Sequence, residues 1–173
     1  MLERTLVLLK PDAVQRGLMG RIISRFEDAG FKIIGTKMVF VDEAFGKKHY
    51  EDISQIITRR GEKVYRSLMK YMQQGPVMAL CLEGVNAVEQ VRKMVGPTEP
   101  KVALPGTIRG DFAHVSIAYA DQKNIAVKNL IHASGNLKEA ELEIALWFKK
   151  QELHSYKSVH DQHIPTALNN RIK

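Results

Sequence analysis

Two residues in the last third of the chain could together carry nucleophilic chemistry. His132 directly follows the apolar run 129–131 and lies just before the expected N-terminus of a helix over 137–148. Glu143 lies on the apolar face of that helix, where a carboxylate needs a polar partner. That face is formed by Ala140, Ile144 and Trp147. A His–Glu pair would fix one imidazole nitrogen as an N–H donor and leave the other as a nucleophile. Periodicity alone leaves an alternative open, in which Glu143 reaches the helix edge and His132 is a turn residue.

Three cations at the ends of different elements could bind a polyphosphate. Lys10 ends an apolar strand, Arg92 lies on a helix predicted over 86–95, and Arg109 lies between two glycines in an irregular loop. Arginine binds phosphate through two parallel hydrogen bonds, and lysine binds it as a point charge. The free N–H groups of the helix after His132 would add to such a site. Taken singly, each cation is also explained as a solvated surface residue.

Two other patterns resemble ligand sites and are not interpreted as such. Residues 30–37 contain the glycines, threonine and lysine of a phosphate-binding loop, but in the wrong order and leading into a strand rather than a helix. His160 and His163 form an H-x-x-H pair in a polar tail, without further ligands nearby to complete a zinc site. The remaining histidines, among them His49, are single and show no pattern.

Hydrophobic periodicity predicts an α+β domain in which helices pack on an antiparallel sheet. Strands are expected over 5–9, 32–41 and 77–82, and a hairpin over 113–119 and 125–131. Helices are expected over 19–29, 43–50, about 60–73, 86–95 and 137–148. Asn136 is expected to cap the last helix, because Glu139 follows three residues later. The segment 96–110 has three prolines and no clear period, which is typical of a functional loop.

Length and composition limit the class of protein. The chain has 173 residues, 45% hydrophobic and 26% charged, which suits one compact domain. Its apolar runs are far shorter than the ~20 residues of a membrane-spanning helix, and no secretory signal is visible. Cys81 is the single cysteine, so no internal disulfide is possible and a reducing, cytoplasmic location is expected.

The formal net charge of +7 is unevenly distributed. Residues 59–70 hold five basic side chains and one acid, a net charge of +4, and residues 149–173 hold five and two, a net charge of +3. The rest of the chain is neutral. These two segments allow an alternative function, a nucleic-acid-binding module, whose affinity would fall steeply with salt. They are equally compatible with attraction of small anions or with solvated surfaces.

Four segments of the chain resemble one known family. They are Lys10-Pro11-Asp12-Ala13-Val14-Gln15-Arg16-Gly17-Leu18, Pro105-Gly106-Thr107-Ile108-Arg109-Gly110-Asp111, Asn129-Leu130-Ile131-His132-Ala133-Ser134, and Glu141-Leu142-Glu143-Ile144-Ala145-Leu146-Trp147-Phe148. In this order they resemble the signatures of the nucleoside diphosphate kinases, from about residue 3 to 156. The resemblance implies a ferredoxin-like β-α-β-β-α-β fold and ping-pong transfer of a γ-phosphate between nucleotides.

The resemblance also implies a role for individual residues. His132 would become phosphohistidine, Glu143 would orient it, and Ser134 would lie beside this pair. The positions that match phosphate and ribose contacts are Lys10, Tyr50, Arg92, Thr98, Arg109 and Asn129. Mg²⁺ would bind mainly through the nucleotide phosphates rather than a protein cage. The partners implied are nucleoside di- and triphosphates and further copies of the chain, as hexamers or tetramers of dimers. Residues 1–156 would form the catalytic domain and 157–173 a polar tail.

The chain departs from the family pattern at three places. Segments near 53–62 and 113–124 are longer than usual by roughly half a dozen and roughly ten residues. The residue that stacks on the base would therefore be Val64 or Tyr65, and its opposite neighbour Ala126 or Val127. Gly135 replaces the usual aspartate after Ser134. None of these departures removes a residue that the chemistry needs.

Overall fold

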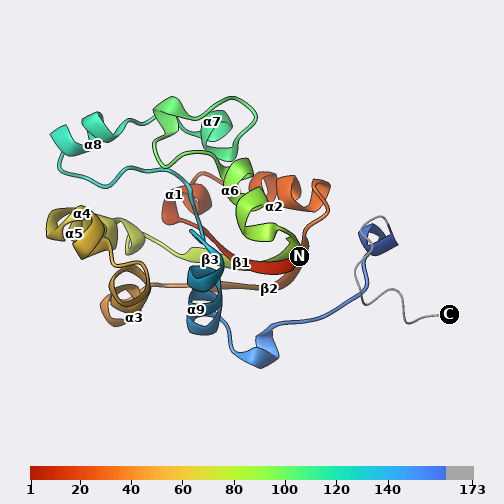
Figure 1. Ribbon diagram of the computed structural model, residues 1–173. Helices are drawn as coiled ribbons and strands as arrows, with labels where there is room; N and C mark the ends of the chain where they lie inside the picture. The colour runs from red at the N-terminus through yellow and green to blue at the C-terminus, as the bar shows by residue number, and fades with distance from the viewer. Residues whose placement is uncertain (163–173) are drawn as a thin grey trace.

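One four-stranded antiparallel sheet forms the centre of the molecule (Figure 1). The computed structural model describes residues 1–162. The strands are β1 (Leu2–Leu9), β2 (Lys32–Val39), β3 (Val77–Val85) and β4 (Ile131–Ala133), in the spatial order β2-β3-β1-β4. β1 pairs with β3 over its whole length, and its last residues pair with β4, where Leu8 lies opposite His132. The central strand therefore leads directly to the predicted nucleophile.

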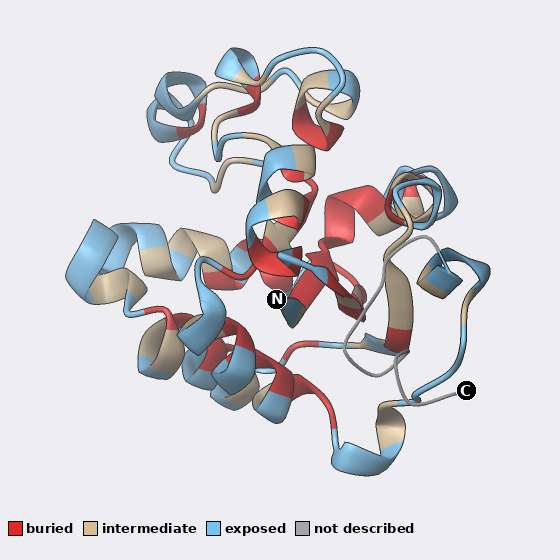
Figure 2. Cartoon of the chain, turned by 45° about the vertical axis from the view of Figure 1, so that its right-hand side comes forward, coloured by how far each residue is buried: buried red, intermediate tan, exposed pale blue. Residues whose placement is uncertain are grey.

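Helices cover both faces of the sheet, because β1 is apolar on both. Leu6 and Leu8 point into one core and Val7 and Leu9 into the other, as the alternation of a strand requires. The first core is covered by α5 (Glu62–Met72), α9 (Leu137–Trp147) and the π-helix η1 (Lys48–Ile53). The second is covered by α2 (Met19–Asp28), α6 (Ala87–Val95) and α7 (Ile108–Phe112). Figure 2 shows the buried residues along the sheet and on the inner sides of the helices. The predicted ferredoxin-like α+β fold is confirmed.

The helix predictions are correct in position, and one differs in form. The remaining helices are α1 (Pro11–Gln15), α3 (Glu43–Lys47), α4 (Ile56–Arg60) and α8 (Ile117–Gln122), with short 3₁₀ turns η2 (Pro100–Val102), η3 (Lys150–Glu152) and η4 (Val159–Gln162). The helix expected over 43–50 is α-helical only to Lys47 and continues as η1. Asn136 caps α9 as predicted, accepting a hydrogen bond from the Glu139 amide at 2.9 Å.

The hairpin predicted over 113–119 and 125–131 is wrong. Residues 117–122 form α8, whose first turn is capped by Ser116 through a hydrogen bond from the Tyr119 amide at 3.1 Å. Only Ala120 of this helix is buried, and β4 begins at Ile131. The apparent alternation therefore reflects a short helix on the surface, which lies outside the sheet.

Residues 149–162, which follow α9, run along the outside of the fold (Figure 1). The last described turn, η4, is tied to β2 by an ion pair between Lys32 and Asp161, with an N–O distance of 2.9 Å. His163, the second residue of the H-x-x-H pair, lies outside the described residues. Within residues 1–162, no helix is both long enough and apolar enough to cross a membrane.

A substitution at Phe26 measures how much the packing of α2 on the second core contributes to the free energy of unfolding. Its side chain is fully buried on α2. We expect Phe26→Ala to lower the free energy of unfolding by about 3–5 kcal/mol, because it leaves a cavity in a packed core. Urea unfolding at one fixed protein concentration measures this change. Glu27→Ala on the exposed side of the same helix is the control, and an equal loss in both variants would contradict the assignment of Phe26 to the core.

Candidate active site

A cavity of about 860 Å³ opens at the end of β1 where β4 begins. One wall comes from α4 and α5, and the opposite wall comes from α8 and the segment after it. Its floor holds His132, together with Lys10 and Arg109. The two lengthened segments of the sequence thus form the two sides of one pocket, and the predicted chemistry lies between them.

His132 and Glu143 form the predicted pair. Nε2 of His132 lies 2.9 Å from Oε1 of Glu143, whose side chain is fully buried. The other carboxylate oxygen accepts a hydrogen bond of 2.6 Å from the Ser134 hydroxyl. Ser134 in turn accepts a hydrogen bond of 3.1 Å from the Leu6 amide. The alternative in which Glu143 reaches solvent at the helix edge is therefore wrong.

The charge of Glu143 determines which nitrogen of His132 carries the proton. Burial alone would raise the pKa of the Glu143 carboxyl, but His132, His49 and Ser134 outweigh burial and lower this pKa to about 2. An ionised carboxylate only accepts hydrogen bonds, so Nε2 of His132 must be the donor. In the neutral ring, Nδ1 then keeps a free lone pair. The pair holds a potential nucleophile in one tautomer.

His49 supports His132 from behind and was missed in the sequence. Its ring is fully buried and meets the His132 ring edge to face, with 4.9 Å between centroids. Nδ1 of His49 accepts a hydrogen bond of 3.2 Å from the indole N–H of Trp147. Burial, with a smaller contribution from His132, lowers the pKa of His49 to about 3, so the ring stays neutral. Its position on a π-helix gives no periodic signal that could have identified it.

The same three residues do not fit a metal centre. The potential ligand atoms of His49, His132 and Glu143 all lie within 4.8 Å of one another. However, the Trp147 N–H occupies the Nδ1 lone pair of His49, and Nε2 of His132 carries a proton toward Glu143. Oxygen ligands, which Mg²⁺ prefers, are represented by this one carboxylate, already hydrogen-bonded on both oxygens. The cluster is organised to hold an imidazole.

A strained turn lies directly before β4, the strand that carries His132. Leu130 has a φ of 70°, and the Ile131 amide donates to the Asn129 carbonyl at 2.8 Å, which makes a γ-turn. The Lys10 amide donates to the Leu130 carbonyl at 2.8 Å, and the Leu130 amide donates to the Asp12 carboxylate at 3.2 Å. Such a conformation costs on the order of 1–3 kcal/mol in a residue with a side chain. Contacts from the end of β1 thus hold an unfavourable turn next to the nucleophile.

Lys10 is a buried cation at this turn. Its ammonium group donates a hydrogen bond of 2.8 Å to Oδ1 of Asn129, whose amide nitrogen donates to the Thr98 carbonyl at 2.8 Å. Burial, followed by the charge of Arg109, lowers the pKa of Lys10 to about 7. An anion bound in the pocket would favour the charged form of Lys10, because it places a negative charge next to the desolvated ammonium group.

Arg109 holds the irregular loop against the strand of the nucleophile. Its guanidinium group donates to the carbonyls of Gly96 at 2.8 Å, Asn129 at 3.2 Å and Ile131 at 2.6 Å. Burial lowers its pKa to about 10, which leaves it charged at neutral pH. A guanidinium group has five N–H donors, so two remain for a ligand. Part of the role expected of Arg109 as a phosphate contact is therefore a role in positioning backbone.

The other predicted site residues are also brought to the pocket, with one exception. Its lining includes Tyr50, Val64, Arg92, Thr98, Ala126, Val127 and Asn129. Tyr65 is outside this lining and packs against the core under α5, because it lies one step further around the helix than Val64. Three basic residues of the +4 segment, Arg59, Arg60 and Lys63, line the pocket as well.

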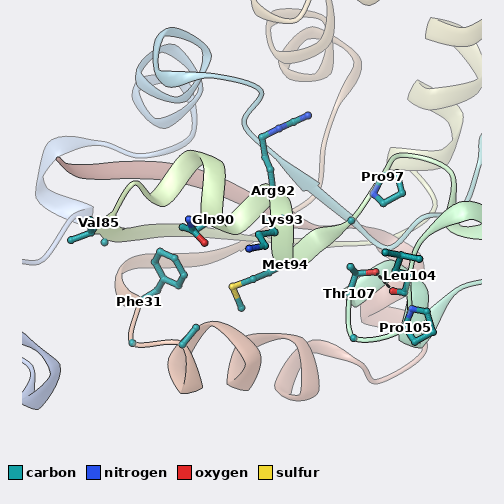
Figure 3. A pocket seen from close by; sticks show the side chains of 15 residues that line it. Phe31, Val85, Gln90, Arg92, Lys93, Met94, Pro97, Leu104, Pro105 and Thr107 are labelled. Carbon is teal, nitrogen blue, oxygen red and sulfur yellow. Dashed lines mark hydrogen bonds between the residues drawn. The ribbon is translucent and has the colours of Figure 1, made fainter. Parts of the chain in front are cut away.

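A second, larger cavity of about 940 Å³ lies on another side of α6. Its lining includes Phe31, Met94 and Leu104 and contains no histidine or carboxylate. Figure 3 shows Arg92 extending from α6 away from Phe31 and Met94, so this cation does not point into the space between them. The chemistry belongs to the smaller pocket that holds His132.

Comparison with known proteins agrees with this geometry. The family model described as nucleoside diphosphate kinase matches residues 3–153. A nucleoside diphosphate kinase of Borreliella burgdorferi is 47% identical over 157 residues, covering 91% of this chain and 93% of the relative. One of Pyrococcus horikoshii is 49% identical over 154 residues, covering 89% and 90%.

Among solved structures, the chain is similar to a transition-state mimic of a nucleoside-diphosphate kinase from Borrelia burgdorferi with bound vanadate and ADP. The TM-score is 0.90 and the sequence identity 46%, covering 94% of this chain and 96% of that one. The likeness therefore includes almost the whole chain.

The depressed pKa of Glu143 predicts a specific loss of stability in acid. A carboxyl group whose pKa is lowered by folding, here from 4.5 to about 2, stabilises the protein above the unfolded value, and this contribution disappears as the pH falls toward 2. At about 1.4 kcal/mol per pKa unit, the contribution is a few kcal/mol. Unfolding free energies of wild type and Glu143→Gln, measured from pH 6 to pH 2, should converge as the pH falls. A constant difference between the two would contradict the ionised pair.

Proposed function

Because the chain belongs to the nucleoside diphosphate kinase family, whose members are phosphotransferases, we propose that His132 takes the γ-phosphate of a nucleoside triphosphate and passes it to a nucleoside diphosphate. One observation carries this proposal. The 2.9 Å contact between Nε2 of His132 and ionised Glu143 leaves Nδ1 as a nucleophile, in a pocket that Lys10, Arg92 and Arg109 also line.

In the first half-reaction, the lone pair of Nδ1 attacks the γ-phosphorus. The N–P bond forms while the bond between this phosphorus and the bridging oxygen breaks, and the nucleoside diphosphate leaves with that electron pair. The imidazole becomes positively charged as the bond forms, and Glu143 stabilises this charge through the proton on Nε2. Lys10 and the free N–H groups of Arg109 are assigned to the phosphate oxygens, where negative charge develops on transfer.

In the second half-reaction, a terminal oxygen of another nucleoside diphosphate attacks the phosphohistidine, and the N–P bond breaks. The same pocket serves both nucleotides in turn, which is ping-pong kinetics. Tyr50 is assigned a hydrogen-bond donor role, because its buried hydroxyl lines the pocket and burial raises its pKa, which keeps it protonated. Ser134 fixes Glu143 and stays out of the transfer itself.

Mg²⁺ is proposed as the divalent ion, entering on the nucleotide. Glu143 and Glu139 are both engaged by protein groups, since Glu143 contacts His132 and Ser134, and Glu139 contacts Arg59 and Asn136. The phosphate oxygens of the nucleotide are therefore proposed as the main ligands of this ion. When bound, Mg²⁺ supplies neutralisation of charge on those oxygens.

The nucleoside part is assigned to the outer half of the pocket. Val64 on α5 and Ala126 with Val127 opposite line its two sides, and they are suited to the faces of a base. Three of the five cations of the +4 segment line this same pocket. That charge supports attraction of anionic nucleotides rather than a separate nucleic-acid surface.

Assembly, domain limits and location remain part of the proposal. Met38 is exposed on the edge strand β2, and Phe40 is exposed just after it, which supports a homo-oligomer; hexamers or tetramers of dimers are the forms that the resemblance implies. Residues 1–156 are assigned to the catalytic domain and 157–173 to a polar tail. A reducing, cytoplasmic location is consistent with a free and buried Cys81.

Labelling tests the phosphohistidine directly. Incubation with γ-labelled ATP should give a phosphoprotein that is labile in acid and stable in alkali, and His132→Ala should give none. His154→Ala removes an exposed imidazole outside the pocket and is the matched control, which should label as wild type does. Wild-type protein without label would rule out the proposed intermediate.

The lowered pKa of Lys10 predicts that nucleotide binding takes up a proton. In the protein without nucleotide, the pKa of Lys10 is about 7, so Lys10 is mostly neutral above this pH. A bound polyphosphate restores its charge. Affinity for ADP should therefore fall by up to about tenfold per pH unit between pH 7.5 and 9. Calorimetric titrations at pH 8 in two buffers of different ionisation enthalpy measure the proton uptake. Lys10→Arg, which stays charged, should show no uptake, and equal uptake in both proteins would assign the proton to another group.

A further inference from the structure

Helix α4, within one of the two lengthened segments, packs against the core through Ile56 but has no buried residue. It has five residues, Ile56–Arg60, and none of them is buried. Gln55 before it and Gly61 after it have φ values of 52° and 88°, so the chain turns sharply at both ends. Yet α4 forms part of one side of the pocket, through Ile56, Arg59 and Arg60. Its first turn is held by the packing of Ile56 on the core and by a hydrogen bond of 2.9 Å from the Ile57 amide to the Glu51 carboxylate, and a further contact holds its last turn.

An ion pair joins α4 to the helix that carries Glu143. Nη2 of Arg59 lies 3.1 Å from Oε1 of Glu139, in the first turn of α9. The Asn136 side-chain amide donates to the same oxygen at 3.0 Å. Arg59 is half exposed, whereas the Glu139 side chain is only 14% exposed. The bridge thus connects two segments 80 residues apart in the sequence, and both of its residues line the pocket.

Gly135 makes room for this bridge. A Cβ at position 135 would stand 2.5 Å from Oε2 of Glu139, which is too close for any side chain unless Glu139 moves. A side chain at this position would therefore require the Glu139 carboxylate to shift. The absence of a side chain at Gly135 is thus compatible with the position that Glu139 takes in the bridge.

Glu139 has a local role, because it lies in the first turn of α9, where the helix dipole favours an acid and the Asn136 side chain contacts it. That local role does not require Arg59. A carboxylate that lines a pocket for polyphosphates repels the ligand, and pairing with it takes the charge of Arg59 away from the ligand as well. Arg60 and Lys63 line the same pocket and form no ion pair among the described residues. The ion pair between Arg59 and Glu139 is explained if its effect is to hold α4 in a fixed position.

We propose that Arg59 and Glu139 are positioning residues, whose bridge holds α4 against the N-terminus of α9 and thereby sets the width of the nucleoside half of the pocket. This inference rests on the proposed function. The bridge leaves the contact between His132 and Glu143 untouched, so it acts on nucleotide binding and not on the transfer step. Its partial exposure limits the effect to a few-fold, as for other exposed ion pairs.

A double-mutant cycle tests the bridge. Arg59→Ala and Glu139→Ala should each raise KM for the nucleoside diphosphate about three- to fivefold with kcat unchanged, and the double variant should be no worse than either single one. A different pattern is expected if the two charges act on the ligand independently. Removal of Glu139 would then lower KM and removal of Arg59 would raise it. The double variant would return to the wild-type value. That second pattern would overturn the proposal.

Hydrogen exchange provides a readout that does not depend on turnover. Amides of residues 56–61 should exchange faster in both single variants, and no faster in Arg60→Ala, which removes a cation from the same helix without an ion pair. Arg66→Ala, which breaks an exposed pair with Glu62 on α5, is the control outside the pocket. If wild type formed no phosphohistidine, the proposed function would fail while this comparison still decided the role of the bridge. Unchanged exchange in both single variants would refute it.

Discussion

The rest of the site depends on a carboxylate that has been removed from water. Glu143 is fully buried, and both its oxygens must be satisfied from within the fold. His132 on β4 satisfies one oxygen, and Ser134 satisfies the other while it accepts a hydrogen bond from the Leu6 amide of β1. One charge therefore ties α9 to two strands of the sheet. The tautomer of the nucleophile follows from the same requirement, so folding and reactivity share one set of hydrogen bonds.

The part of this arrangement that can be predicted from sequence is the part with a local cause. A glutamate on an apolar helical stripe needs a partner, and His132 lies a few residues upstream, which is why the pair was found. The cap at Asn136 and most of the order of elements along the chain likewise follow from periods of a few residues. The segment 113–131 misled for a related reason, because a short surface helix with one buried residue shows almost no period of its own.

Tertiary contacts decide the remainder, and they leave little trace in the sequence. Arg109 was expected at phosphate, yet three of its donors hold backbone carbonyls from two distant segments. The choice between Val64 and Tyr65 depends on how α5 is rotated over the core, which a count of residues through a lengthened segment cannot give. His49 became part of the site only through the packing of its ring against His132 and its contact with Trp147.

At the γ-turn of Leu130, the placement of the site residues is achieved at the expense of local stability. A leucine with positive φ is a poor choice for local stability, and glycine would relax the backbone there. The turn is nevertheless held between Lys10 and Asp12, at the point where the strand delivers Asn129 on one side and His132 on the other. The protein is accordingly less stable than its fold allows at this residue. Substitutions selected only for thermal stability are therefore expected at this turn, where they would displace His132 and lower activity.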